Sequence, residues 1–399
     1  MVTEEKNRVA DLDEKFMRRA ISLALKGQGR VNPNPLVGAV IVKDGKIIGE
    51  GYHRKYGGLH AERNAINSCR ENIEGSTMYV TLEPCCHYGK TPPCTEAIIE
   101  AKISRVVVGS SDPNPLVAGK GIEILKDSNI EVTTGVLEEE CDRINRVFFT
   151  YIREKRPYVT MKYAMTMDGK ICTVSGKSKW ITSEKSRARV HLDRHRYSAI
   201  LVGVNTVAMD NPMLNTRLEN IEKLVPESEF ENYGITKVDG NFEVRNPVRV
   251  ICDTNLRTPM DSNIVKTARK YRTVIATCSQ DLSKIKKYRD AGCSVVVQEQ
   301  YGRIDMKKLM NTLYEMGIDS VIVEGGAAVN WSSLEGKIID SVQTYISPKI
   351  FGGITAKTPV SGEGVESPDG AYMLEIRNIE YLGEDILVES EVADCLREL

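Results

Sequence analysis

The chain has 399 residues, more than one hydrophobic core usually serves, so two domains are expected. It has 54 basic and 55 acidic side chains, which give a net charge of -1. A protein that binds along a nucleic-acid backbone typically has an excess of basic residues, and this chain has none. No apolar run approaches the roughly 18 residues that span a bilayer, and the acidic, polar residues 1–16 do not form a signal peptide.

The first half of the chain predicts strands that alternate with helices. Strands are expected at residues 36–42, 46–52, 77–82 and 104–110, and helices at 12–27, 60–70, 95–102 and 137–155. The two earliest strands flank Lys-Asp-Gly, a typical hairpin signal. Such alternation indicates a three-layer α/β/α domain.

A domain boundary is expected where a charged helix end meets Pro157, which gives domains of residues 1–153 and 154–399. The second domain again predicts an α/β series. Strands are expected at 158–164, 198–203, 248–252, 272–276, 294–297, 320–323 and 342–346, with helices at 183–197 and 305–316. Residues 219–246 are acidic and interrupted by proline and glycine, so we interpret them as a surface insertion.

Ten cysteines are spread over the whole length of the chain. Dispersed cysteines without a secretion signal favour reduced thiols in a cytoplasm. Most are therefore expected to be small core residues. Only Cys85, Cys86 and Cys94 lie close together in the sequence.

The clustered cysteines belong to the stretch TLEPCCHYGKTPPC, residues 81–94. A redox pair would need Cys-x-x-Cys, which is absent, and the Pro-Pro step indicates an exposed loop rather than a buried thiol cluster. A structural zinc site usually needs four protein ligands. His60, Cys85 and Cys94 supply three, which leaves an open position for water, the arrangement of a catalytic zinc site.

Glu62 lies two residues after His60, at the start of the same predicted helix. A carboxylate there could carry a proton from metal-bound water to a leaving nitrogen. His-x-Glu followed by Pro-Cys is the signature of the zinc deaminases. The signature usually continues as Pro-Cys-x-x-Cys, whereas eight residues separate Cys85 from Cys94 here.

Several motifs together carry a resemblance to one family. NPNPLVGAVIV, HAERNAI and TLEPCCHYGKTPPC resemble the deaminase half of the bifunctional riboflavin-biosynthesis deaminase/reductases, in which the longer cysteine spacing is normal. MKYAMTMDGKI, SKWITSE, ILVGVNTVAMDNPMLNTR and VEGGAAV resemble the reductase half in the same order. The resemblance implies a cytidine-deaminase-like domain followed by a domain similar to dihydrofolate reductase.

The resemblance implies Zn²⁺ as the metal and a 2,5-diamino-6-(5-phosphoribosylamino)pyrimidinone, which loses its 2-amino group, as the deaminase substrate. Glu62 is then the catalytic proton carrier. The matching substrate positions are Asn34, His53, His87, Lys90, Asp112 and Asn114. Lys90 could meet the phosphate as a point charge. Taken singly, His53 or Asn114 would more often be a surface polar residue. Cys86 occupies a position at which a small polar residue is usual, and we interpret it as having no metal role.

For the second domain the resemblance implies NADPH as hydride donor and a ribosyl group reduced to a ribityl chain. Its cofactor positions are Ala164, Trp180, Thr206, Asp210, Thr254, Gly325 and Gly326, and its substrate positions are Lys162, Ser178, Arg194, Leu214, Arg217 and Glu324. Without the motifs, Trp180 would be read as core packing and Arg194 as a solvated helix face. Lys162, Asp210 and Glu324 are the candidate proton donors.

The Gly-Gly loop is itself a weak signal, because such loops are common at strand ends and no G-x-G-x-x-G is present. The resemblance implies a cytoplasmic homo-oligomer that acts on a phosphorylated pyrimidine and binds neither nucleic acid nor membrane. Three alternatives remain open: a base deaminase of nucleosides or nucleic acids with an unrelated nucleotide-binding domain, an enzyme with one decayed site, and a non-enzymatic nucleotide sensor.

Overall fold

The computed structural model describes residues 2–89, 91–115, 117–218, 221–299 and 302–393. The chain forms two compact units: unit 1 is Met1–Lys155 with Glu227–Glu243, and unit 2 is Arg156–Pro226 with Val244–Leu399. None of the helices in the described ranges is long and apolar enough to cross a membrane.

Unit 1 contains a five-stranded sheet in the order β2-β1-β3-β4-β5. Its strands are β1 (Gly38–Lys43), β2 (Lys46–Tyr52), β3 (Thr77–Leu82), β4 (Arg105–Ser110) and β5 (Glu131–Thr134). Its helices before the domain boundary are α1 (Val2–Leu25), α2 (Ala61–Ser68), α3 (Cys94–Glu100), α4 (Lys120–Asp127), α5 (Glu138–Ile144) and α6 (Arg146–Arg153). The strands β1 and β2 form the predicted hairpin, whereas β3, β4 and β5 run parallel to one another.

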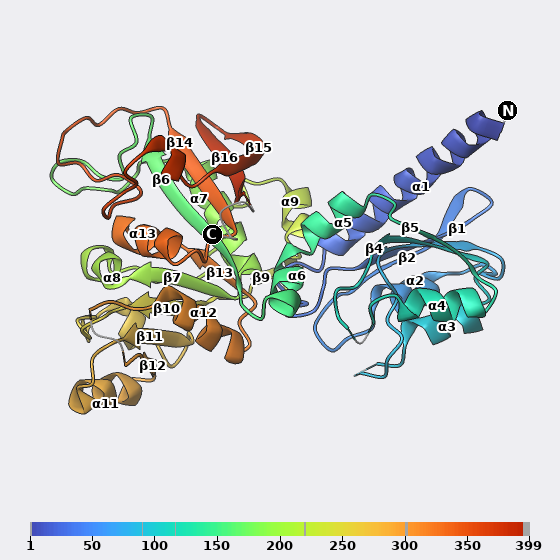
Figure 1. The fold of residues 1–399 in the computed structure, drawn as a ribbon, viewed down its shortest axis with the longest axis horizontal. Coiled ribbons are helices and arrows are strands. Elements are labelled where there is room, and N and C mark those ends of the chain that lie inside the picture. The colour runs from blue at the N-terminus through green and yellow to red at the C-terminus, as the bar shows by residue number, and fades with distance from the viewer. Residues whose placement is uncertain (1, 90, 116, 219–220, 300–301, 394–399) are drawn as a thin grey trace. The chain divides into compact units, whose positions relative to one another are not determined.

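Helices cover both faces of this sheet, as Figure 1 shows. Along β1, Ala39 and Ile41 pack against the layer of α2, α3 and α4, whereas Val40 and Val42 pack against α1 and α5. This alternation follows from the two-residue period of a strand. The sheet is therefore buried on both sides, as the predicted three-layer architecture requires.

The single helix predicted over residues 137–155 is wrong, because the chain forms two helices there, α5 and α6, that meet at Asn145. The Asn145 side chain is buried and forms two hydrogen bonds to the backbone of Leu36: it accepts from the N–H at 2.8 Å and donates to the carbonyl at 2.9 Å. These tertiary bonds hold Asn145 at φ -110°, outside the helical range, so the helix is interrupted.

The predicted surface insertion, residues 219–246, divides between the units. Residues 227–243 belong to unit 1 and contain α9 (Glu227–Asn232), β8 (Thr236–Val238) and β9 (Asn241–Glu243). Of the predicted segment, residues 219 and 220 lie outside the described ranges. The domain limits 1–153 and 154–399 stay a prediction.

Unit 2 contains a nine-stranded sheet in the order β12-β11-β10-β7-β13-β6-β14-β16-β15. Its strands are β6 (Tyr158–Thr166), β7 (Ala199–Gly203), β10 (Val248–Cys252), β11 (Thr273–Thr277), β12 (Ser294–Val297), β13 (Ser320–Val323), β14 (Ser341–Ser347), β15 (Leu374–Leu382) and β16 (Asp385–Val392). The strands from β12 to β14 are parallel. The hairpin of β15 and β16, which the sequence interpretation did not include, continues the sheet antiparallel beyond β14.

Most helices of unit 2 begin at a residue whose side chain caps the first turn. They are α7 (Glu184–Arg196), α8 (Val204–Asp210), α10 (Asn263–Lys266), α11 (Leu282–Asp290), α12 (Met306–Glu315) and α13 (Ala327–Glu335), with a 3₁₀ turn at Pro368–Gly370. Ser183, Asp281 and Asp305 cap α7, α11 and α12 by accepting a hydrogen bond from a backbone N–H of the first turn.

Apolar clusters lie on both faces of the parallel strands of unit 2. Leu201 and Val250 point into one cluster, and their neighbours Ile200 and Ile251 point into the other. Strands buried on both faces are typical of parallel sheets. The loops after β7, β10 and β13 therefore leave the same edge of the sheet, where ligands usually bind.

Candidate functional site

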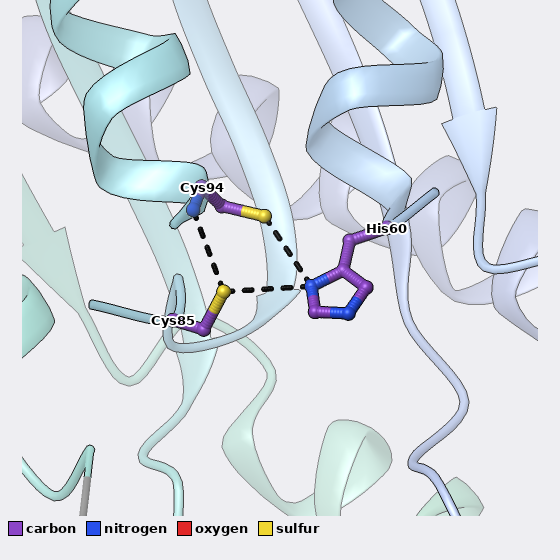
Figure 2. A group of neighbouring side chains, drawn as sticks. All are labelled: His60, Cys85 and Cys94. Atoms are coloured by element: carbon purple, nitrogen blue, oxygen red, sulfur yellow. Dashed lines mark hydrogen bonds between the residues drawn. The ribbon is translucent and has the colours of Figure 1, made fainter. Parts of the chain in front are cut away.

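Three elements of unit 1 bring His60, Cys85 and Cys94 together. His60 directly precedes α2, Cys85 lies in the loop after β3, and Cys94 is the first residue of α3. The His60 Nδ1 atom lies 3.4 Å from the Sγ atoms of both cysteines. The backbone N–H of Cys94 also donates to Cys85 Sγ at 3.4 Å (Figure 2). The predicted metal ligands thus converge on one point.

The spacing of these three atoms fits a tetrahedral zinc ion. Zinc binds cysteine sulfur at about 2.3 Å and histidine nitrogen at about 2.0 Å, so neighbouring ligand atoms should lie about 3.6 Å apart. All three ligand atoms lie within 4.8 Å of one another, and within the described ranges this is the one group of its kind. Cys86 is half-buried and outside that group.

Contacts with Cys94 and then His60 lower the pKa of the Cys85 thiol well below its usual range. The thiolate is the form of cysteine that binds zinc. The lowered pKa therefore supports Cys85 as a zinc ligand, as the geometry does.

A cavity of about 260 Å³ opens beside these residues. Its walls include Asn34, His53, His60, Glu62, Cys85, His87, Asp112 and Asn114, together with Leu82 and Phe148. Every described residue predicted for the deaminase, except the ligand Cys94, therefore lines one cavity. Lys90, the predicted phosphate contact, lies outside the described residues.

Glu62 is the acidic residue of the first turn of α2, and it is buried in the cavity wall. Burial raises the pKa of its carboxyl, and the nearby Cys85 adds to that effect. A carboxyl whose pKa moves towards neutrality exchanges protons readily at that pH. Glu62 therefore has the place and the chemistry of a general base and acid.

The polar residues of the cavity are held by specific hydrogen bonds. His53 Nδ1 lies 3.0 Å from the Leu59 carbonyl, so that nitrogen carries the proton, and Nε2 accepts from the Asn34 amide at 3.2 Å. Asp112 Oδ1 accepts from the backbone N–H of Asn114 at 2.8 Å. Burial raises the pKa of Asp112 to about 6, which brings the protonation equilibrium of this carboxyl close to neutral pH.

The sequence interpretation did not single out Glu83, which organises one wall of this cavity. Its buried carboxylate accepts hydrogen bonds from the backbone N–H groups of Gly119 at 2.9 Å, Gly121 at 3.0 Å and Ile122 at 3.3 Å. It thereby fixes the loop that carries Asp112, whose own N–H lies 3.4 Å away. Its place one residue before Pro-Cys in TLEPC was the available signal.

Unit 2 contains a larger cavity, of about 800 Å³, at the edge where the parallel strands end. Five of the predicted residues line it: Ser178, Thr206, Asp210, Thr254 and Gly326. Gly326 directly precedes α13, so the N-terminal turn of that helix faces the cavity. Backbone N–H groups at a helix start favour phosphate.

Other predicted residues of unit 2 lie away from this cavity lining. The Trp180 side chain is 66% exposed and stacks with Arg187, whose guanidinium carbon lies 4.2 Å from the ring centroid, so a core-packing role is wrong. Leu214 is buried in an apolar cluster. Ala164 is half-buried on β6, and Gly325 lies beside Gly326 in the loop. The structure therefore brings together part of the predicted cofactor set.

Arg194 and Glu324 form a bidentate ion pair, with nitrogen–oxygen distances of 2.9 and 2.8 Å. Both side chains are largely buried, so the alternative of a solvated helix face for Arg194 is wrong. Burial alone would raise the pKa of Glu324, but Arg194 and then Lys162 outweigh it and lower that pKa. Glu324 is therefore ionised at neutral pH.

Arg217 lies beside this pair and beside His191, which the sequence interpretation did not include. The Arg217 N–H donates to His191 Nδ1 at 3.2 Å, and its guanidinium donates to Asn215 Oδ1 at 2.7 Å. Burial first, and then Arg194 and Arg217, lower the pKa of His191 to about 3. His191 is thus neutral and accepts from Arg217, which helps to orient it.

Arg257 is a further residue that the sequence interpretation missed. It is exposed and lines the unit 2 cavity, in the turn after β10 that also carries Thr254. Buried Asp253 fixes this turn, because its Oδ2 accepts from the backbone N–H groups of Arg257 at 2.6 Å and Thr258 at 2.7 Å. Within the described residues the Arg257 side chain forms no ion pair, so it is available to an anionic ligand.

Comparisons with known families match both units. Residues 10–110 match the family model for the cytidine and deoxycytidylate deaminase zinc-binding region, and residues 157–388 match the RibD C-terminal domain. The riboflavin biosynthesis protein RibD of Actinobacillus pleuropneumoniae is 53% identical over 389 residues, which cover 97% of each chain.

Solved structures agree over nearly the whole length. The diaminohydroxyphosphoribosylaminopyrimidine deaminase/5-amino-6-(5-phosphoribosylamino)uracil reductase of Thermotoga maritima is 41% identical, with a TM-score of 0.81, over 96% of this chain and 99% of its own. RibD of Acinetobacter baumannii, form 1, is 34% identical, with a TM-score of 0.81, over the same shares. The predicted deaminase-like and reductase-like folds are confirmed.

Proposed function

Since this chain belongs to the RibD family of bifunctional deaminase/reductases of riboflavin biosynthesis, we propose that its two cavities act in turn on one phosphorylated pyrimidine. The chain is a zinc-dependent deaminase and an NADPH-dependent reductase. The proposed substrate is 2,5-diamino-6-(5-phosphoribosylamino)pyrimidin-4(3H)-one, and the proposed product is 5-amino-6-(5-phosphoribitylamino)uracil. Similarity to the Thermotoga maritima protein, a diaminohydroxyphosphoribosylaminopyrimidine deaminase, supports this choice of substrate.

In the unit 1 cavity, His60, Cys85 and Cys94 are the proposed zinc ligands. Zinc held by these residues would supply an acidified water. Glu62 would carry a proton from that water to the departing nitrogen, and its burial, which raises the pKa of the carboxyl, favours this role.

The remaining polar groups of this cavity orient the substrate. Asn34 and His53 are already joined by a hydrogen bond, so they form one preorganised pair of donors and acceptors. Asp112 and Asn114 face the cavity from the loop that Glu83 holds. His87 also lines it, and Lys90 is proposed to meet the phosphate.

In unit 2, Thr206, Asp210, Thr254 and the Gly325–Gly326 loop are the proposed cofactor contacts, together with Ala164 and Trp180. NADPH supplies the hydride that opens the ribosyl group. The first turn of α13 suits the pyrophosphate.

Strand order supports a role for Arg257 in holding the extra phosphate of NADPH. The Gly-Gly loop follows β13, and Arg257 follows β10, two strands further along the sheet with β7 between them. Neighbouring strands are about 4.8 Å apart, so the ends of β10 and β13, which lead into these two loops, lie about 10 Å apart. We therefore assign the 2′-phosphate to Arg257, since a guanidinium binds phosphate through paired hydrogen bonds.

Lys162, Ser178, Arg194, Leu214, Arg217 and Glu324 are the proposed substrate positions of the reductase. Arg194 is already engaged by Glu324, so Arg217 is the better candidate to bind the substrate phosphate. Glu324 is held ionised, so it has no proton to give, which leaves Lys162 and Asp210 as candidate proton donors. A cytoplasmic homo-oligomer remains our proposal, and none of the described cysteines forms a disulfide, which supports the location.

One observation carries the deaminase assignment: three zinc-ligand atoms lie together beside a cavity, and two of these ligands and a buried glutamate form part of its wall. The test measures zinc content and ammonia release from the diaminopyrimidine phosphate, followed by NADPH consumption. Cytidine and a single-stranded oligonucleotide are offered in parallel, and ammonia from either one instead would favour the base-deaminase alternative. Glu62→Gln should retain zinc and release no ammonia, since an amide cannot carry the proton.

A further inference from the structure

Residues 227–243, here called the 227–243 lobe, are a part of unit 1 that the proposed function does not use. In sequence they follow α8 of unit 2, yet in the fold they belong with residues 1–155. Within the lobe, Phe230 on α9 and Phe242 on β9 stack with ring centroids 4.9 Å apart, and Tyr233 and Ile235 are buried. The lobe is therefore a packed structure and not a loose loop.

The lobe contacts the turn of residues 26–30, which follows α1. Lys26 pairs with Glu231 at 2.9 Å, and the Arg30 guanidinium bonds to Thr236 at 2.5 Å and to Glu243 at 2.8 Å. Gly234 has φ +66°, and a Cβ there would lie 2.3 Å from the carbonyl oxygen of Gln28. The two backbones thus approach so closely that only glycine fits.

The other side of the same turn supports the deaminase cavity. The backbone carbonyl of Arg30 accepts a hydrogen bond from the Tyr56 N–H at 3.0 Å. A Cβ at Gly27 would lie 2.6 Å from the His53 carbonyl oxygen, so the turn packs directly on that strand end. His53, Tyr56 and, four residues after Arg30, Asn34 all line the cavity.

We propose that the 227–243 lobe is a positioning element of the deaminase, which holds the turn of residues 26–30 and through it Asn34, His53 and Tyr56 in place for substrate. The proposal rests on the deaminase function argued above. Arg30 is the central residue, because its side chain binds the lobe while its backbone binds the cavity wall. The zinc ligands lie on other elements, so the lobe should affect substrate binding more than zinc binding.

A charge exchange tests this role in the full-length zinc protein. Arg30→Glu places two carboxylates together and should raise the deaminase KM for the diaminopyrimidine phosphate about threefold to fivefold, the range that an exposed ion pair supports. The value of kcat, the zinc content and reduction of the deaminated intermediate should not change. Adding Glu243→Arg should bring KM most of the way back to the wild-type value. Lys102→Glu, which breaks an exposed pair with Glu74 elsewhere in unit 1, is the matched control.

Amide hydrogen exchange gives a second readout that needs no activity. The Tyr56 amide should exchange faster in Arg30→Glu and return towards the wild-type rate in the exchanged pair, because its hydrogen bond ends on the Arg30 carbonyl. Gly234→Ala should have the same effect through its backbone clash. Unchanged exchange in both variants, or a KM that the second substitution does not restore, would overturn the proposal. Absence of ammonia release by the wild type would instead refute the deaminase function.

Discussion

Replacing Glu324 by glutamine should destabilise unit 2 strongly. The carboxylate accepts two hydrogen bonds from the Arg194 guanidinium, and the two side chains are only 10% and 11% exposed. An amide can accept one of these bonds but carries no charge. The substitution therefore leaves a guanidinium buried without a counter-charge, which typically costs about 3–5 kcal/mol.

Proton linkage gives a similar magnitude and predicts its pH dependence. A glutamate whose pKa falls from its ordinary value to about 2 on folding contributes about 3 kcal/mol of stability. Because the pKa is lowered in the folded state, the contribution is complete above the pKa of the unfolded chain, about 4.3, and is lost as the pH falls towards the folded value. The difference between wild type and Glu324→Gln should thus be largest at neutral pH and about half as large near pH 3.

Tryptophan fluorescence during urea unfolding measures this difference in one unit. The chain has two tryptophans, Trp180 and Trp331, and both belong to unit 2. Glu335→Gln is the matched control, because Glu335 pairs with Arg303 at 2.7 Å but both side chains are well exposed. An exposed pair contributes about 0–1 kcal/mol, so this control should unfold almost as the wild type does.

Two results would refute the argument about Glu324. A loss no larger than that of Glu335→Gln would mean that the buried pair contributes little beyond its desolvation cost. A loss that stays constant from pH 7 down to about pH 3 would mean that the carboxylate does not titrate at the lowered pKa inferred for it.

Three further predictions separate the sites. Cys94→Ser should lose bound zinc while Cys86→Ser keeps about one ion per chain, and metal analysis with the opposite result would move the ligand to Cys86. Arg217→Ala should lower kcat/KM for reduction about 10- to 100-fold, the contribution of a charged hydrogen bond, without reducing ammonia release; equal loss of both activities in a folded variant would indicate one shared site. Arg257→Ala should raise KM for NADPH about tenfold or more but leave NADH use unchanged, and an equal effect on both cofactors would exclude recognition of the 2′-phosphate.

The local sequence pattern was sufficient to predict the His60, Cys85 and Cys94 cluster and most of the parallel strands of unit 2. His60 and Glu62 occur together because one helix start carries both, and Cys85 and Cys94 lie in one short loop–helix segment, so their chemistry is visible within a few residues. Parallel strands buried on both faces give continuous apolar runs, which explains why the interior strands β10 and β13 coincide with their predicted ranges.

The C-terminal hairpin escaped prediction for a corresponding physical reason. Its first strand, β15, is largely exposed and mixes charged with apolar residues, including Arg377 and Glu380, so it lacks the apolar run of the interior strands. Such a strand is specified by its pairing with β16, which only the folded chain reveals.

Tertiary contacts decided the features that involve residues far apart in sequence. Asn145 interrupts a helix because Leu36, 109 positions earlier, takes both hydrogen bonds of its side chain. Arg194 is buried because Glu324 neutralises it across 130 positions. The 227–243 lobe belongs to unit 1 because it packs against the turn that contains Arg30 and binds the side chain of that residue. Helical and strand periods act over a few residues, so a sequence read by itself reveals which groups are present, whereas only the fold decides which distant groups become partners.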